Sequence, residues 1–128
     1  MTGRPVNSKL ESSASVLYKG QVEILQTEIF RDWMNGFRDR KARVRIDDRL
    51  RRLASGNAGD TRSVGGSVRE LRFHFGPGYR VYYMWRDGVL IILLNCGDKA
   101  SQKRDISLAK RLAKEANDGL EGLPIRSS

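Results

Sequence analysis

Residues 70 to 83, E-L-R-F-H-F-G-P-G-Y-R-V-Y-Y, alternate apolar and polar side chains on both sides of a Gly-Pro-Gly turn. Because successive side chains of a strand point to opposite faces, this pattern predicts a two-stranded hairpin with one apolar face. The apolar face holds Leu71, Phe73, Phe75, Tyr79, Val81 and Tyr83. The opposite face holds Glu70, Arg72, His74, Arg80 and Tyr82. Arg, His and Tyr bind phosphate and transfer protons, so this second face is a candidate functional surface.

Two helices are predicted before the hairpin. A strand over residues 21–26 leads to Thr27, whose side chain can cap a helix, and the next apolar side chains recur at helical spacing. These side chains are Ile29, Phe30, Trp33, Met34 and Phe37. A second helix is predicted over residues 40–54, with many Arg and Lys side chains at the surface and one buried stripe. The stripe consists of Ala42, Ile46, Leu50 and Leu53.

The remaining pattern supplies a connector, a central strand and a last helix. Gly56 ends the second helix and opens a glycine-rich connector through residue 66. Asp87-Gly88 predicts a tight turn, and the apolar run 89–94 predicts a strand at the centre of the sheet. Ser101 is expected to cap a helix that runs to about residue 117. Its buried side is expected to hold Ile106, Ala109, Leu112 and Ala113.

These elements together predict an α+β fold with one small, mostly antiparallel sheet. Two N-terminal helices pack on the apolar face of the sheet, a C-terminal helix follows, and the basic and aromatic face is expected to stay exposed. The domain is expected to cover residues 20–117. Residues 1–19 and 118–128 are expected to be flexible tails, since they are rich in Ser, Gly and Asn or lie at the chain end.

The charge balance indicates a polyanionic partner. The 128 residues include 24 Lys and Arg against 15 Asp and Glu, which gives a net charge of +9. Most of the basic residues are arginine, the side chain suited to bidentate contact with phosphate. Nucleic acid is the first candidate, an acidic protein is the second, and plain solubility is the third reading of this charge.

Several classes of protein are excluded or disfavoured. Cys96 is the single cysteine, so an intramolecular disulfide and CxxC zinc patterns are excluded. The longest apolar run has six residues, too short to span a bilayer, and no secretory signal is apparent, so the cytoplasm is expected. Asp98 and Asp105 are candidate metal ligands, but no third metal ligand accompanies them and the positive charge of Lys99 lies beside them. We therefore expect no metal, and we expect no cofactor.

Three stretches of the chain resemble a known family. They are R-L-R-R-L-A-S-G-N-A-G-D (49–60), V-R-E-L-R-F-H-F-G-P-G-Y-R-V-Y-Y (68–83) and C-G-D-K-A-S-Q-K-R-D-I (96–106). Their combination is similar to the phage-derived "addiction module killer protein" group, the HigB-like toxins of the RelE/ParE superfamily. The similarity covers about residues 20–116.

This resemblance implies the toxin of a type II toxin–antitoxin pair. RelE- and HigB-type members cut messenger RNA, commonly on the ribosome, whereas ParE-type members poison DNA gyrase by protein contact. A third possibility is a toxin that binds RNA but has lost cleavage. The implied partners are mRNA, the ribosome and a cognate antitoxin, usually a small helix-turn-helix protein through which operator DNA is bound.

The resemblance also implies roles for individual residues. Arg80 matches the arginine that stabilises the scissile phosphate in RelE-type toxins. Glu70 and Arg72 fall where RelE has two lysines, and Lys99 falls near an arginine proposed there as the acid. The late tyrosine of RelE has no match in this chain, so the catalytic set is altered.

The residues themselves fit metal-free RNA cleavage, in which the ribose 2′-hydroxyl attacks the adjacent phosphorus. That reaction needs a base, cations around the phosphate and an acid for the leaving oxygen. His74 is the first choice for proton transfer, because the ordinary histidine pKa is about 6.5, and Glu70 is the alternative base. Tyr82 is expected to stack on a base. Further expected RNA contacts are Arg69, Arg86 and Lys103.

Overall fold

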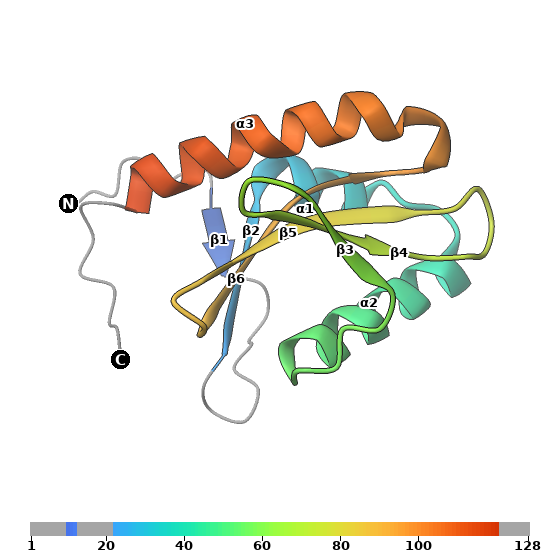
Figure 1. Cartoon of the computed structure of the whole chain (residues 1–128). Helices are drawn as coiled ribbons and strands as arrows, with labels where there is room; N and C mark the ends of the chain where they lie inside the picture. Colours follow the sequence, from blue (N-terminus) through green and yellow to red (C-terminus); the bar gives the residue numbers. More distant parts are fainter. Residues whose placement is uncertain (1–9, 13–21, 121–128) are drawn as a thin grey trace.

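The computed structural model describes residues 10–12 and 22–120, and these form a six-stranded sheet in the order β1-β2-β6-β5-β4-β3 (Figure 1). The strands are β1 (Leu10–Ser12), β2 (Glu23–Thr27), β3 (Thr61–Gly65), β4 (Val68–Arg72), β5 (Arg80–Arg86) and β6 (Leu90–Gly97). Strands β2 and β6 pair parallel, and every other neighbouring pair is antiparallel. The predicted α+β class and mostly antiparallel sheet are confirmed.

Helices cover both faces of the sheet (Figure 1). They are α1 (Glu28–Asn35), α2 (Arg40–Ala54) and α3 (Gln102–Leu120), and a 3-10 turn, η2 (Lys99–Ser101), leads into α3. Helices α1 and α2 pack on one face, around Ile46 and Leu71, and α3 packs on the other, around Ala109 and Ile92. None of the helices in the described part of the chain is long and apolar enough to cross a bilayer.

The first helix begins with the predicted cap, and the second begins with a cap that was not predicted. The Thr27 hydroxyl accepts the Phe30 N–H at 3.1 Å and donates to the Leu94 carbonyl at 2.5 Å, which fixes α1 to β6. Asp39 caps α2 by accepting the Ala42 N–H at 3.1 Å. One predicted core residue is wrong: Ile29 is 43% exposed, because the buried stripe of this short helix is too narrow to include it.

Strand β6 lies at the centre of the sheet, as the apolar run predicted. Its residues from Leu90 to Cys96 are buried, and it lies between β2 and β5. The tight turn before β6 is confirmed, since Asp87 has φ 55° and Gly88 has φ 71°, the positive values that a type I′ turn requires. A strand that is apolar on both faces needs a covering layer on each face.

That second layer contradicts the predicted open face. Helix α3 covers the side of the sheet that carries the polar residues of the hairpin, so Glu70, Arg80 and Tyr82 are buried at 0%, 4% and 0% exposure. The same face also carries apolar residues from β4, β5 and β6, and these pack against the apolar stripe of α3. The predicted alternation within the hairpin is confirmed. The prediction that the polar face is exposed is wrong for Glu70, Arg80 and Tyr82, whereas His74 is exposed.

The hairpin and its neighbours differ from the prediction in further details. Strand β4 ends at Arg72 and β5 begins at Arg80, so residues 73–79 form a loop rather than a tight turn. The predicted connector contains β3, an edge strand paired with β4, in which Thr61 and Val64 have side chains that favour strands.

The two predicted tails are each partly structured. Residues 10–12 form β1, which pairs with β2, and the rest of 1–19 lies outside the described residues. Helix α3 continues through residue 120, and 121–128 lie outside the described residues.

The junction between β6 and α3 is closely packed. Asp98, rather than the predicted Ser101, caps the start of the helical segment by accepting the N–H groups of Ala100 and Ser101 at 2.9 and 3.1 Å. The Ser101 hydroxyl donates to the Asp105 carboxylate at 2.5 Å. A Cβ atom at Gly97 would lie 1.9 Å from Asp105 Oδ2, so this junction requires glycine.

Gly97→Ala is therefore expected to destabilise the protein by about 1–3 kcal/mol, because the added methyl group must displace the buried Asp105 side chain. Urea unfolding followed by circular dichroism measures this change. Gly36→Ala is the control: its Cβ would lie 3.5 Å from the nearest atom, and we expect a change within about 0.5 kcal/mol. Equal stability of the two variants would contradict the close approach at Gly97.

Candidate functional site

A buried carboxylate, Glu70, lies on β4 and contacts the start of α3. It accepts hydrogen bonds from Gln102 Nε2 at 2.7 Å, Arg62 Nε at 2.9 Å and the Tyr82 hydroxyl at 3.0 Å. Burial raises the pKa of Glu70, but these three donors outweigh it and hold the pKa below the ordinary value of 4.5. The carboxylate is therefore charged, hydrogen-bonded and enclosed. The prediction that it faces solvent is wrong.

Tyr82 belongs to the same buried network. Its ring is 0% exposed in the core between the sheet and α3, and burial and the neighbouring Glu70 raise the pKa of its hydroxyl. A nucleic acid base can stack only on an accessible ring face. The prediction that Tyr82 stacks on a base is wrong for this arrangement, and its ring serves packing instead.

Arg80 organises the loop over residues 73–79. Its Nη1 atom donates to the carbonyls of Phe73 at 3.3 Å, Gly78 at 3.0 Å and Tyr79 at 3.1 Å. Its Nε atom lies 3.9 Å from Glu70 Oε2 and has no hydrogen-bond partner among the described residues. One edge of the guanidinium therefore holds backbone, while the charge remains beside a single, already shared carboxylate.

Arg72 is the register partner of Arg80 across β4 and β5. Its side chain is half-buried, and its Nε atom also lacks a hydrogen-bond partner among the described residues. Cross-strand partners lie about 5 Å apart, so two guanidinium groups share one end of the hairpin. Both Nε atoms are buried, so the adjacency of the two positive charges, rather than these donors, is what favours an anion at this end of the hairpin.

His74 follows β4 rather than lying in it, and its side chain is 67% exposed. Its Nε2 atom is hydrogen-bonded to the carboxylate of Asp60, a residue of the loop before β3. The hydrogen bond from His74 lowers the pKa of Asp60, and the positive charges of Arg72 and Arg49 lower it further. The Arg72 N–H donates to the Asp60 carbonyl at 2.9 Å, so Asp60 contacts both the histidine and Arg72. Asp60 was not predicted, because no spacing rule connects a residue of that connector to the hairpin.

Lys99 approaches the same place from η2. Its side chain is exposed, and its N–H donates to the Pro77 carbonyl at 3.4 Å. Both Lys99 and Arg80 flank Gly78, since a Cβ there would lie 3.3 Å from Lys99 Cβ and 3.5 Å from Arg80 Nη1. Each of these residues thus adjoins the next one. We call the set the hairpin site, and it consists of Lys99, Arg80, Arg72, Asp60 and His74.

The other predicted RNA contacts lie at different places. Arg86 is at the far end of β5, about 20 Å of strand from Arg80, and donates to Asn117 Oδ1 at 2.9 Å. Arg69 alternates with Glu70 along β4, so its side chain starts on the α2 side of the sheet. Lys103 is exposed and follows Gln102 in the first turn of α3. The structure thus separates Arg86 from the hairpin site.

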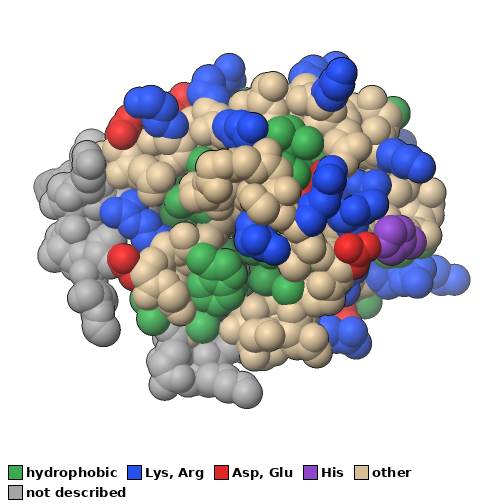
Figure 2. All heavy atoms as spheres, in the orientation of Figure 1, with side chains coloured by type: hydrophobic (Ala, Val, Ile, Leu, Met, Phe, Trp, Pro, Cys, Tyr) green, Lys and Arg blue, Asp and Glu red, His purple; other side chains and the backbone are tan. Residues whose placement is uncertain are grey.

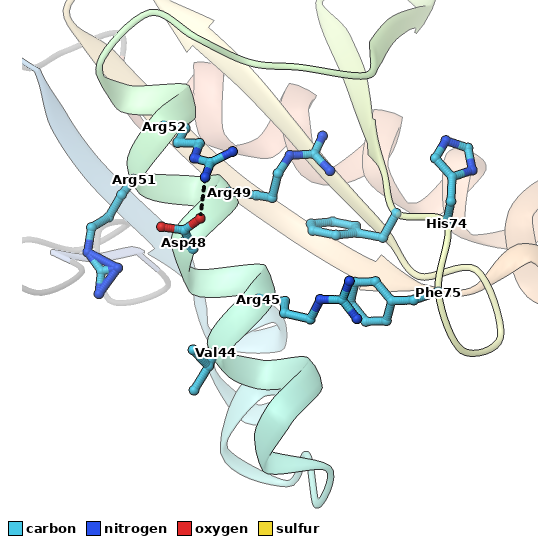
Figure 3. Close-up of a pocket in the computed structure, with 9 residues that line it drawn as sticks. Val44, Arg45, Asp48, Arg49, Arg51, Arg52, His74 and Phe75 are labelled. Atoms are coloured by element: carbon cyan, nitrogen blue, oxygen red, sulfur yellow. Dashed lines mark ion pairs between the residues drawn. The ribbon is translucent and has the colours of Figure 1, made fainter.

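A cleft lies between α2 and the start of the 73–79 loop (Figure 3). From the sequence, the arginines that line it were expected to be ordinary surface charges. It has a volume of about 610 Å³ and is lined by Phe73, His74, Phe75 and arginines of α2. The Arg45 guanidinium lies 4.1 Å from the centre of the Phe75 ring, and Arg49 lies 4.6 Å from that of Phe73. His74 therefore belongs to both the hairpin site and this α2 cleft. Figure 2 shows the histidine at the edge of a group of Lys and Arg side chains.

Comparison with known proteins places this geometry in a family. The model of the phage-derived protein Gp49-like family (DUF891) matches residues 32–114, a range that contains the whole hairpin site and the α2 cleft. The chain belongs to the Gp49-like family. Gp49-like proteins are RelE-like toxins, which agrees with the resemblance found in the sequence at this level.

One relative of this Gp49-like protein is an uncharacterized protein of Haemophilus influenzae (strain Rd). The two are 44% identical over 94 residues, which cover 73% of this chain and 95% of the relative.

The described residues contain no group of three or more His, Cys, Asp and Glu side chains that could hold a metal ion. Asp98 and Asp105 are instead occupied in hydrogen bonds at the start of the helical segment. The side chains of the hairpin site supply two guanidinium groups, one ammonium group and a histidine paired with a carboxylate.

Proposed function

We propose that this Gp49-like protein is the toxin of a type II toxin–antitoxin pair and that it cleaves messenger RNA at the hairpin site. The observation that supports the proposal most directly is the cross-strand pair of Arg72 and Arg80, which places a half-buried and a buried guanidinium group together at one end of the hairpin. Such a pair is suited to hold the oxygens of one phosphate as negative charge develops on them.

His74 and Lys99 lie at opposite ends of the hairpin site, so one can act as a base and the other as an acid on opposite sides of that phosphate. His74 adjoins Arg72 through Asp60, and Lys99 adjoins Arg80 through Gly78. In the proposed reaction, neutral His74 takes the proton of the ribose 2′-hydroxyl, and the 2′-oxygen bonds to phosphorus. The bond from phosphorus to the 5′-oxygen breaks, and that oxygen receives a proton from Lys99. The products are a 2′,3′-cyclic phosphate and a 5′-hydroxyl end.

Glu70 has a positioning role in this proposal. It contacts no substrate, because its carboxylate is enclosed, but it joins the start of α3 to the hairpin and lies 3.9 Å from Arg80. The carboxylate also holds Arg62, whose side chain is 50% exposed beside the site. The buried charge thus fixes the direction of two cations that face the phosphate.

The partners follow from the family and the charge. A net charge of +9 favours both an RNA substrate, presented on the ribosome, and an acidic antitoxin. We propose a small helix-turn-helix antitoxin encoded with the toxin, through which the complex binds operator DNA. The toxin itself then needs no DNA-reading surface.

The test is inducible expression of the wild type and Arg72→Ala, with primer extension on an abundant transcript within minutes of induction. We expect new transcript ends and growth arrest with the wild type, and neither with Arg72→Ala, because the half-buried guanidinium is needed at the phosphate. Arg111→Ala, an exposed arginine on α3, is the control that should behave like the wild type.

Other outcomes would change the proposal. Growth arrest with intact transcripts would contradict RNA cleavage and favour a ParE-type poison of DNA gyrase. Equal cleavage by the wild type and Arg72→Ala would keep the nuclease but remove Arg72 from its site.

A further inference from the structure

We infer that the α2 cleft binds the phosphate backbone of the RNA strand beside the cleaved bond, with Phe75 as a stacking surface for an unpaired base. This inference rests on the proposed function, because it gives the substrate of the hairpin site a second place to bind. It assigns a role to arginines that the cleavage chemistry does not use.

The first argument is the charge along one side of α2. Arg45, Arg49 and Arg52 follow at intervals of four and three residues, so they lie on one side of the helix, about 6 and 4.5 Å apart along its axis. Figure 3 shows these three side chains on the side of α2 that faces the loop of His74 and Phe75. Asp48 is the one acidic residue that lines the cleft, and it pairs with Arg52 at 3.1 Å. The lining is therefore strongly positive, as a groove for a polyanion requires.

The second argument is the aromatic floor of the cleft. Phe75 is half-buried and contacts Phe73 and Tyr79 edge-on, with ring centres 5.8 and 5.7 Å away. Arg45 lies over the Phe75 ring, so a base reaches this face when the exposed Arg45 side chain moves from the ring to the RNA backbone. Single strands of nucleic acid bind to this combination, since bases stack on the rings while cations contact the backbone.

The third argument is continuity with the hairpin site. His74 lines the cleft and also pairs with Asp60. Arg49 joins the two places, because it donates to the Arg72 carbonyl at 2.9 Å and to the Ala58 and Asp60 carbonyls at 3.2 and 3.3 Å. Burial lowers the pKa of the Arg49 guanidinium. A strand whose phosphate is held by Arg72 therefore has the cleft directly beside it.

The experiment measures binding of a fluorescent 2′-O-methyl oligouridine of about ten nucleotides, by anisotropy at several salt concentrations. The methyl group blocks the attacking oxygen, so binding is measured without cleavage. The cleft variant is Arg45→Ala/Arg52→Ala. The control is Arg111→Ala/Lys114→Ala on α3, which removes the same charge from exposed side chains that also form ion pairs along their helix.

We expect the cleft variant to bind about tenfold more weakly, and the slope of log affinity against log salt to fall by about 0.7 for each lost contact. The control should keep the wild-type slope. Phe75→Leu should weaken binding by about fivefold or more without changing the slope, because it removes a stacking surface but no charge.

Two results would overturn the inference. Equal losses in the cleft variant and the control would show a general effect of net charge. Unchanged RNA binding together with weakened binding of the antitoxin would assign the cleft to a protein partner.

The outcome is independent of the cleavage test. If the wild type leaves transcripts intact but the cleft variant loses salt-dependent binding, the cleft remains an RNA site and the proposed cleavage fails. If transcripts are cut and the cleft variant binds like the wild type, the cleft inference fails and the proposed function stands.

Discussion

Glu70→Ala is expected to destabilise the folded protein by about 3–5 kcal/mol. The substitution removes a fully buried carboxylate and leaves the Tyr82 hydroxyl, Gln102 and the inner donor of Arg62 without their acceptor. It also leaves the buried charge of Arg80 without the carboxylate that lies 3.9 Å away. Breaking a buried charge pair on one side is costly because the remaining charge cannot be solvated.

The contribution of Glu70 should also depend on pH. Its folded-state pKa lies below the ordinary value of 4.5, so the folded protein holds the Glu70 proton less tightly than the unfolded chain does. The resulting stabilisation is fully present above the unfolded-state pKa and is lost as the pH falls through the folded-state pKa. The wild type should therefore lose stability in acid more steeply than Glu70→Gln, which has no proton to gain.

Urea unfolding at neutral pH and at several acidic pH values measures both effects. Glu115→Ala is the control, since that carboxylate is 52% exposed on α3 and pairs with Arg111 at 4.0 Å, so we expect a change within about 0.5 kcal/mol. A loss below about 1 kcal/mol for Glu70→Ala would contradict the buried network. Parallel acid curves for the wild type and Glu70→Gln would contradict the lowered pKa.

The elements of this fold were predictable because local patterns fix them. Helical spacing and the cap at Thr27 predicted α1, and the bounds predicted for α2 agree with the structure. The buried central strand followed from its continuous apolar run. Which face of the sheet a distant helix covers is not a local property. The cover over Glu70 and Tyr82 depends on α3, which follows these residues in the chain and packs by its small side chains.

The candidate site was predictable to the same extent. Residues within the hairpin and the segment after β6 were recognised from their types and spacing, and the structure places Arg72, Arg80 and Lys99 together. Asp60 lies in the connector before the edge strand β3, and its contact with His74 arises only when that strand pairs with β4. A long-range pairing of this kind leaves no periodic signal in a single sequence.

His74→Ala is expected to reduce the rate of RNA cleavage by about 10²–10⁴, under the proposed function. The loss follows if this histidine takes the proton of the attacking hydroxyl. Because the side chain is 67% exposed, the substitution should leave the free energy of unfolding within about 0.5 kcal/mol of the wild type. A large loss of rate at unchanged stability therefore separates chemistry from folding.

Asp60→Asn tests how the histidine is held. Asn keeps the size of the Asp60 side chain but removes the negative charge that pairs with the histidine, so we expect a smaller loss of about tenfold. Binding of the uncleavable oligouridine should stay near the wild-type value in both variants, because the arginines are intact. The measurement is the single-turnover cleavage rate, and equal rates for the wild type and His74→Ala would remove the histidine from the mechanism.

A second readout on the same pair does not depend on activity. The hydrogen bond from His74 is the largest influence that lowers the pKa of Asp60, so His74→Ala should raise the pKa of that carboxyl toward its ordinary value of 3.8. Carboxyl chemical shifts followed by NMR through an acid titration measure it. A raised Asp60 pKa together with a lost cleavage rate would show that the pair exists and acts. A raised pKa at an unchanged rate would show that the pair is structural and that another group takes the proton.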